Sequence, residues 1–145
     1  MARPEAWRLD PAAYPHHVTV QTRFQDLDVL GHLNNVAFAA LFETARTRFN
    51  RDAELWGERF SGRRAVVASQ EIHYLAEGSY PEDVEVATGI GPIGNRSWSI
   101  LAAMFQGGCP IATCDVVIVM DRGEDGSGMP DAFRTRLEGL RMREG

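Results

Sequence analysis

Residues 25–49, QDLDVLGHLNNVAFAALFETARTRF, join a short acidic loop to the start of a long apolar helix. Asp26 and Asp28 stand in the loop. Either Asn34 or Asn35 is a suitable N-cap, because its side-chain oxygen can accept a hydrogen bond from a free backbone N–H. The free N–H groups of a first helical turn carry partial positive charge, which suits an oxygen that gains negative charge. A carboxylate beside such a helix start predicts a hydrolytic centre.

The helix is predicted to be buried at its beginning. Residues 36–40 are apolar on nearly every side, and polar residues return only from Glu43 onward. One apolar stripe recurs at helical spacing: Phe38, Leu41, Phe42, Ala45 and Phe49. The pattern extends to Trp56 and stops at Gly57, a favourable C′ residue, so the helix is a rod about 30 Å long. Such a rod needs a sheet around it.

The rest of the chain is dominated by period-two patterns. Alternation predicts a strand over residues 18–24 and four more after the helix, which cover residues 65–75, 83–90, 96–106 and 111–121. Short Gly- and Pro-containing turns separate the last four, which indicates antiparallel pairing. A short helix over residues 131–143 ends the chain, with Pro130 at its start. The fold class is therefore α+β, with an antiparallel sheet packed on one main helix.

Composition narrows the class of protein. The 145 residues fit one domain over residues 1–145, with residues 1–15 as a loose lead-in rich in Pro and Ala. A net charge of −5 argues against nucleic acid as a partner. All 15 basic residues are arginine, which excludes lysine Schiff-base chemistry and a P-loop. No apolar run is long enough for a membrane span and no signal-peptide pattern is present, so we expect a cytoplasmic protein without a membrane partner.

The motif Asp26-x-Asp28-x-x-Gly31-His32-x-Asn34-Asn35, with Phe38, Glu43 and Ala45-Arg46 after it, resembles the 4-hydroxybenzoyl-CoA thioesterase-like branch of the hotdog-fold acyl-CoA thioesterases. The order of elements is also similar to that of a hotdog domain. The resemblance implies a curved, five-stranded antiparallel sheet wrapped around one long central helix, with a short C-terminal helix. It covers the chain after residue 15.

The resemblance also implies how the site works. The protein would be an enzyme that hydrolyses a thioester of coenzyme A or of an acyl carrier protein. Asp28 would be the catalytic carboxylate and the backbone N–H of Asn35 would polarise the carbonyl. The active site would lie at the interface of a homodimer, or of a homotetramer built from dimers. Asn95, Arg96 and Ser97 would help to hold the pantetheine arm and the nucleotide. Coenzyme A would be part of the substrate, so no separate cofactor is expected.

The remaining motif residues have structural as well as functional interpretations. Asp26 is expected to be structural and paired with an arginine, and Gly31, His32 and Asn34 to shape the loop while they line the substrate site. Phe38 would also line that site, although it lacks the hydroxyl common at this position in the family. Glu43 is a further catalytic candidate that could orient the attacking water, and an i,i+3 ion pair with Arg46 is its simpler interpretation.

Other motifs are rejected. Residues 89–94 spell GxGxxG, but a proline lies inside the match and strand-like sequence follows, so they form a hairpin turn rather than a dinucleotide site. No GxSxG elbow is present. The histidines and the two cysteines have no metal-ligand spacing, so no metal is expected.

Two other functions remain open from the sequence. The same scaffold could be a hydratase or dehydratase acting on acyl-CoA, with His32 and Glu43 as the acid–base pair. It could also be a non-catalytic acyl-binding module. Within the thioesterase hypothesis, Asp28 can attack the carbonyl as a nucleophile or act as a general base for water.

Overall fold

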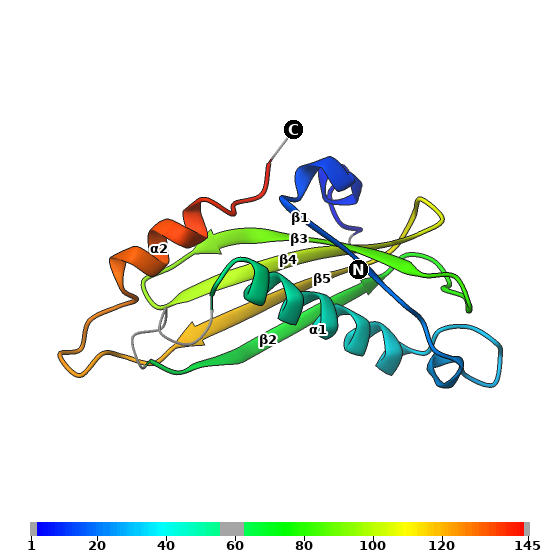
Figure 1. Cartoon of the computed structure of the whole chain (residues 1–145), viewed down its shortest axis with the longest axis horizontal. Coiled ribbons are helices and arrows are strands. Elements are labelled where there is room, and N and C mark those ends of the chain that lie inside the picture. Colours follow the sequence, from blue (N-terminus) through cyan, green and yellow to red (C-terminus); the bar gives the residue numbers. More distant parts are fainter. Residues whose placement is uncertain (1–2, 56–62, 144–145) are drawn as a thin grey trace.

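The computed structural model describes residues 3–55 and 63–143 (Figure 1). In chain order the elements are the 3-10 helices η1 (Ala6–Leu9) and η2 (Pro11–Ala13), strand β1 (His16–Val20), the 3-10 helix η3 (Phe24–Asp26), helix α1 (Asn35–Asp52), strands β2 (Ala65–Tyr74), β3 (Val84–Ile93), β4 (Ser97–Gln106) and β5 (Cys109–Met120), and helix α2 (Asp131–Glu138).

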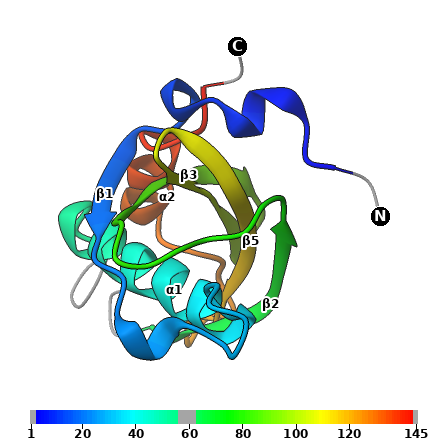
Figure 2. The ribbon, with the colours of Figure 1, turned by 90° about the vertical axis from the view of Figure 1, so that its right-hand side faces the viewer.

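The five strands form one antiparallel sheet in the order β1-β3-β4-β5-β2. The sheet curls around α1, as the end-on view of Figure 2 shows. This arrangement confirms the predicted hotdog architecture of a curved sheet, one long helix and a short C-terminal helix. Within the described part of the chain, β2 pairs with β5 along one side, and its other edge faces solvent.

Helix α1 begins as predicted but ends earlier. Asn34 is the N-cap, and its Oδ1 accepts a hydrogen bond from the Ala37 N–H at 2.8 Å. The helix stops at Asp52 because Glu54 adopts a left-handed conformation (φ 56°) and the Leu55 N–H turns back to the Asn50 carbonyl at 2.8 Å. The predicted end at Trp56 and Gly57 is therefore wrong for the helix, and those two residues lie outside the described residues.

Strand boundaries also differ from the prediction. The first strand forms over His16–Val20 rather than residues 18–24, since the chain leaves the sheet after Val20 and turns into η3. Strand β3 extends to Ile93, three residues beyond its predicted end. The final helix stops at Glu138 instead of residue 143, because the following segment pairs with β3 where β1 no longer covers it. There the Ile90 N–H donates to the Leu140 carbonyl at 2.9 Å.

The core has two parts, one on each face of the sheet. The larger part lies between α1 and the concave face, where Phe42, Phe49 and Met104 are at most 2% exposed. The smaller part lies on the other face, where Tyr14, Ala103 and their neighbours are buried under the N-terminal segment. Alternate residues of the central strands serve the two parts, as a strand's period of two requires.

The N-terminal segment is packed, not loose. Arg8 is 7% exposed, and its guanidinium donates to the Tyr14 hydroxyl at 2.9 Å, to the Ala102 carbonyl at 3.2 Å and to Asp115 Oδ1 at 2.8 Å. The hydrogen bond to Asp115 helps to raise the pKa of Arg8 despite its burial. The prediction of a loose lead-in over residues 1–15 is therefore wrong for these residues, because composition does not reveal that an arginine and a tyrosine latch the segment to the sheet.

Arg8→Ala is expected to lower the free energy of unfolding by about 2 kcal/mol, because it removes the Arg8 hydrogen bonds that latch the N-terminal segment to the sheet. It also leaves the Tyr14 hydroxyl without its guanidinium partner. The loss stays below that of a fully buried ion pair because the Asp115 side chain is 39% exposed. Urea unfolding measures the effect, with Arg3→Ala at an exposed position as control. A loss below about 0.5 kcal/mol would contradict the proposed latch.

Candidate active site

The loop before α1 is fixed at both ends by Asp26. Its side chain is 3% exposed and pairs with Arg23, whose Nη2 lies 2.8 Å from Oδ1 and whose backbone N–H donates to Oδ2 at 2.9 Å. This hydrogen bonding raises the pKa of Arg23. The Asp26 carbonyl accepts a hydrogen bond from the Asn34 N–H at 2.9 Å, which closes the loop on the helix start. Asp26 is thus structural, and its arginine is Arg23.

Asp28 lies inside this closed loop and is exposed. Its Oδ1 accepts hydrogen bonds from the backbone N–H groups of Leu30 at 2.9 Å and His32 at 3.3 Å, and Gly31 between them has a φ of +81°. Its Oδ2 accepts no hydrogen bond from any described residue. One carboxylate oxygen therefore holds the turn and the other is available for chemistry.

The start of α1 offers free donors beside this loop. The N–H groups of Asn35 and Val36 donate no hydrogen bond to another described residue, whereas the Ala37 N–H is capped by Asn34. The surroundings are apolar and exposed: Val29 and Leu30 in the loop and Val36 on the helix are 101%, 76% and 72% exposed. Free N–H groups within an exposed apolar rim are suited to an acyl carbonyl or a partner surface.

His32 is engaged with a carboxylate other than Glu43. Its Nε2 lies 3.0 Å from Glu77 Oε2, in the connection between β2 and β3. The next residue, Leu33, donates its N–H to the Gly78 carbonyl at 3.0 Å. A Cβ on Gly78 would lie 2.5 Å from Leu33 Cδ1, so any larger residue there would displace the Leu33 side chain. His32 and Leu33 therefore hold the loop against the connection between β2 and β3.

Phe38 is 4% exposed, and its ring meets the ring of Tyr74 edge-on with centroids 5.2 Å apart. The contact joins the first turns of α1 to the end of β2, and Tyr74 itself is 52% exposed. Tyr74 is not among the residues that the sequence predicts for the site. A contact with a helix that begins 39 residues earlier leaves no local pattern in the sequence.

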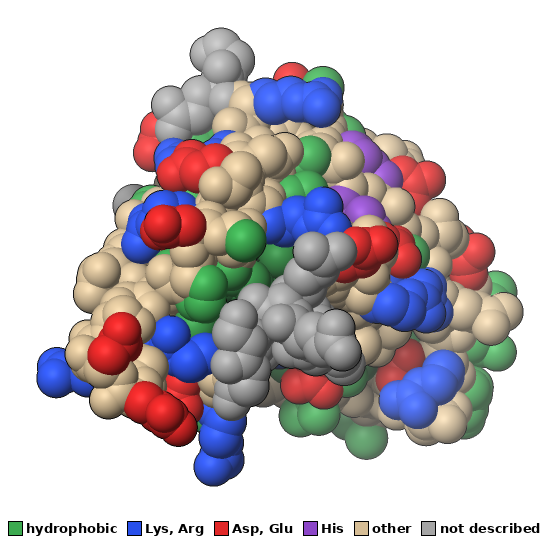
Figure 3. Space-filling view, turned by 60° about the vertical axis from the view of Figure 1, so that its left-hand side comes forward, with side chains coloured by type: hydrophobic (Ala, Val, Ile, Leu, Met, Phe, Trp, Pro, Cys, Tyr) green, Lys and Arg blue, Asp and Glu red, His purple; other side chains and the backbone are tan. Residues whose placement is uncertain are grey.

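Glu43 and Arg46 lie further along α1, in the wall of a cavity of about 290 Å³ between α1 and the sheet. Glu43 is exposed, and Arg46 Nη2 lies 3.7 Å from its Oε2, so the predicted i,i+3 pair forms. The cavity also contacts Val67 on β2, Trp98 on β4 and Ile118 on β5. Figure 3 views the end of the molecule at the left of Figure 1, where charged side chains surround apolar ones.

The turn between β3 and β4 lies at the α2 end of the sheet. Arg96 donates from Nη1 to the Met120 carbonyl at 3.0 Å, which closes the end of β5. The Asn95 carbonyl accepts from the Met129 N–H at 3.0 Å, and Arg134 of α2 donates to the Gly94 carbonyl at 2.9 Å. Within one chain, Asn95, Arg96 and Ser97 are therefore not gathered with Asp28 at the helix start, whereas Asp28, Gly31, His32, Asn34 and Asn35 share one loop.

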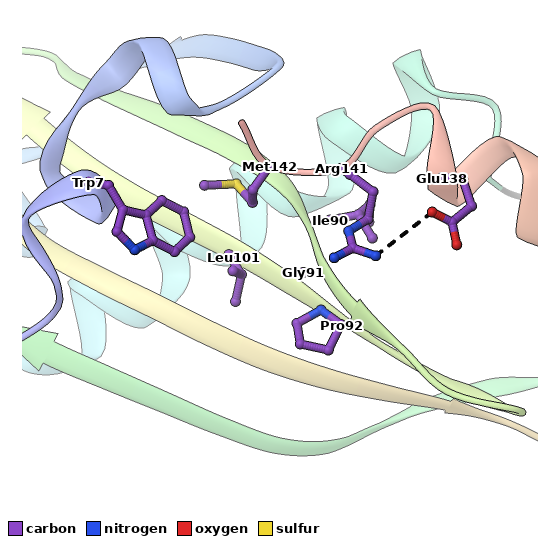
Figure 4. Close-up of a pocket in the computed structure, with 8 residues that line it drawn as sticks. All are labelled: Trp7, Ile90, Gly91, Pro92, Leu101, Glu138, Arg141 and Met142. Atoms are coloured by element: carbon purple, nitrogen blue, oxygen red, sulfur yellow. Dashed lines mark ion pairs between the residues drawn. The ribbon is translucent and has the colours of Figure 1, made fainter. Parts of the chain in front are cut away.

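A second, larger cavity of about 470 Å³ lies beside the N- and C-terminal segments (Figure 4). Trp7 and Met142 flank it, Leu101 and Pro92 contribute from the sheet, and Arg141 lies 3.8 Å from Glu138. None of the residues predicted for the active site lines it. Trp7, Leu101 and Met142 belong to the part of the core on the face of the sheet opposite α1, so we do not assign this cavity to the reaction.

The two cysteines differ in reactivity, which matters for any thiol assay. Cys114 is 2% exposed and burial raises its pKa to about 12, whereas Cys109 is exposed. In the native protein at pH 8 we expect Cys109 alone to react rapidly with a disulfide colour reagent, and both thiols to react after unfolding. A native Cys109→Ser protein should then show almost no fast-reacting thiol, and rapid reaction of that variant would contradict the assignment.

Two further properties of the described residues bear on the class of site. No helix there is long and apolar enough to span a bilayer. No group of three or more His, Cys, Asp or Glu side chains within residues 3–55 and 63–143 is arranged to hold a metal ion.

Comparison with known proteins gives the family. Residues 22–137 match the model of the thioesterase-like superfamily. A thioesterase from Thermus thermophilus, solved with coenzyme A and zinc, is 32% identical with a TM-score of 0.75 over 88% of this chain and 95% of that chain. A predicted thioesterase from Bacillus stearothermophilus is 28% identical with a TM-score of 0.74 over 89% and 98%. The uncharacterized protein YsmA of Bacillus subtilis (strain 168) is 29% identical over 112 residues, 76% of this chain and 75% of that protein. The chain belongs to the thioesterase-like superfamily.

Proposed function

We propose that this protein hydrolyses acyl-CoA thioesters, with Asp28 as the catalytic carboxylate and the Asn35 N–H as oxyanion donor. The observation that carries the proposal is the closed loop before α1. It holds an exposed carboxylate with one unpaired oxygen next to a helix start whose first N–H groups are unpaired among the described residues. Coenzyme A is the proposed carrier because the similar Thermus thermophilus thioesterase was solved with it.

Two routes use the same groups. As a general base, Asp28 takes a proton from water while the water oxygen bonds to the carbonyl carbon. As a nucleophile, Asp28 bonds to that carbon itself and forms a mixed anhydride that water then cleaves. In both routes the C–S bond breaks, coenzyme A leaves as a thiolate, and the thiolate recovers a proton. The oxyanion accepts hydrogen bonds from the helix start, where each donor is worth about 2.7–4 kcal/mol.

The acyl group needs a cavity, and the one along α1 is distant from Asp28 in the same chain. From Asn35 to Glu43, the first residue of the helix in the cavity wall, the helix rises about 12 Å. A second copy removes this separation. If two copies of β2 pair antiparallel, the end of one strand at Tyr74 lies opposite the start of the other at Ala65. Ala65 lines the cavity, and Tyr74 contacts Phe38 near the helix start.

The exposed surface of β2 supports this pairing. Val66, Val67 and Tyr74 are 60%, 51% and 52% exposed along the unpaired edge, which is the kind of apolar edge that proteins normally cover. In the resulting homodimer, each active site combines the loop and helix start of one subunit with the cavity and the β3–β4 turn of its partner. Asn95, Arg96 and Ser97 then come near the Asp28 of the partner subunit, where they can contact coenzyme A.

A thioester panel tests the proposal. Straight-chain, branched and aromatic acyl-CoAs are incubated with the Cys109→Ser protein, so that the colour reagent reports released coenzyme A alone. We expect thiol release from at least one ester at a rate that depends on Asp28. Hydration of an enoyl-CoA without thiol release would indicate a lyase instead. Thermal stabilisation by esters without any turnover would indicate a binding module.

A further inference from the structure

The cavity of about 470 Å³ beside the two terminal segments has a floor made by β3 and β4 (Figure 4). Gly91 and Leu101 form part of this floor, and a Cβ on Gly91 would lie 2.9 Å from Leu101 Cδ1. Gly89, two residues earlier, leaves space for Met142, whose Sδ would lie 2.6 Å from a Cβ there. The first two glycines of the GxGxxG stretch therefore make room for two apolar side chains that line the cavity.

The walls of this cavity come from both ends of the chain and are held by backbone hydrogen bonds. The Ile90 N–H donates to the Leu140 carbonyl at 2.9 Å, and the Met142 N–H donates to the Ile90 carbonyl at 2.9 Å, so the C-terminal segment runs along the edge of β3. The Arg143 N–H donates to the Ala13 carbonyl at 2.8 Å, which joins this segment to the N-terminal one. Both walls are thus fixed before any ligand arrives, as is usual for binding pockets.

The polarity of the cavity is divided between its two ends. At one end Trp7 contributes an aromatic ring, and its Nε1–H is used outside the cavity, where it donates to Glu5 Oε2 at 3.1 Å. At the other end Arg141 Nη1 lies 3.8 Å from Glu138 Oε2, which is an ion pair beyond hydrogen-bond distance. The Arg141 side chain donates no hydrogen bond to any residue that the structure describes.

The guanidinium of Arg141 is placed to receive an anion. Figure 4 shows it between Glu138 and the apolar residues of the cavity. A guanidinium presents a planar fork of donors that matches the two oxygens of a carboxylate. Glu138 and Arg141 are both about half exposed, so their mutual attraction is weak and a ligand can compete for the donors. The cavity therefore has one apolar end and one end suited to a carboxylate.

We propose that this cavity binds a small carboxylic acid with a compact apolar body, whose carboxylate pairs with Arg141 and whose body contacts Trp7 and Leu101. The inference goes beyond the proposed function and does not depend on it. The volume is roughly three times that of a protein cavity known to hold benzene, so two fused rings or a chain of similar size fit. A free acid has the required charge, whereas its amide or thioester lacks it.

Equilibrium dialysis of 2-naphthoate and octanoate tests this inference. All proteins carry Thr47→Trp, which fills the cavity along α1 from an exposed position and so prevents binding there. We expect at least one acid to bind at one molecule per chain, with a Kd about tenfold or more below that of its amide, 2-naphthamide or octanamide. Adding Arg141→Gln should raise the Kd of the acid and leave that of the amide unchanged, so that their ratio falls to about one.

Arg143→Gln is the matched control, because it removes the same charge at a neighbouring exposed position that does not line the cavity. It should keep the ratio of acid to amide. Trp7→Ala should weaken the binding of acid and amide alike, since it removes apolar contact only. The inference is overturned if neither acid binds, if acid and amide bind equally, if Arg141→Gln leaves the ratio unchanged, or if 2-naphthylmethylamine binds more tightly than 2-naphthoate. Dialysis needs no turnover, so these results are independent of the thioester panel.

Discussion

Asp28→Asn is expected to lower kcat/KM by about 10²- to 10⁴-fold on every ester that the wild-type protein hydrolyses, because an amide can neither take a proton from water nor attack as a carboxylate. The fold should be unaffected. The substituted side chain keeps an amide oxygen that accepts from the Leu30 and His32 N–H groups, so the free energy of unfolding should change by less than about 0.5 kcal/mol. Steady-state kinetics and urea unfolding of the same preparation measure both effects.

Asp28→Ala is the matched control for the turn. It removes the acceptor as well as the charge, so we expect the same loss of turnover together with a loss of about 1 kcal/mol in stability. The difference between the two variants separates the structural role of Oδ1 from the chemical role of the carboxylate. Full activity of Asp28→Asn would show that this aspartate is only a turn residue.

The second prediction concerns the exposed edge of β2, where we propose that two copies of the chain pair. A Val66→Glu/Ser69→Glu protein is expected to be monomeric and to lose turnover, with the Kd of the dimer raised at least about 100-fold, because pairing would bury unpaired like charges. The matching Val66→Lys/Ser69→Lys protein should behave in the same way. Mixing the two should restore dimers and activity together. Sedimentation and thiol release measured over one concentration series report both.

Ala132→Glu, at an exposed position on α2, controls for the added charge. It should remain dimeric and active. Val66 also lines the cavity, so a loss of activity in either charged protein alone could arise there. Recovery in the mixture excludes that cause, since both chains still carry charges at residue 66. A charged protein that is monomeric at assay concentration and fully active would contradict the interface site.

Local sequence predicted the parts of this molecule that depend on local contacts. The loop and cap before α1 follow from the hydrogen-bonding habits of Asp, Gly and Asn within a few residues, so Asn34 and the Asp26 pair form where the pattern indicates. The strands follow from period-two alternation. Helix α1 ended earlier than predicted because Glu54 takes a left-handed conformation that residue preferences alone do not indicate.

Features that join distant parts of the chain were not visible in the sequence. The latch from Arg8 to Asp115 spans 107 residues, and the ring contact of Phe38 with Tyr74 joins a helix to an edge strand. Neither position follows a local period or motif. The cavity was hidden for the same reason, because its walls come from α1, β2, β4 and β5 and meet only after the sheet has curled.

The division of one active site between two subunits is tested most directly by mixing two inactive proteins. Asp28→Asn lacks the carboxylate, and Thr47→Trp fills the cavity from an exposed position on α1. In an equal mixture, half of the dimers are mixed and one of their two sites has both an intact Asp28 and an open cavity, so thiol release should recover to about one quarter of the wild-type rate. If each site were contained in one chain, every chain in the mixture would be defective, and a rate that stays at background would contradict the account.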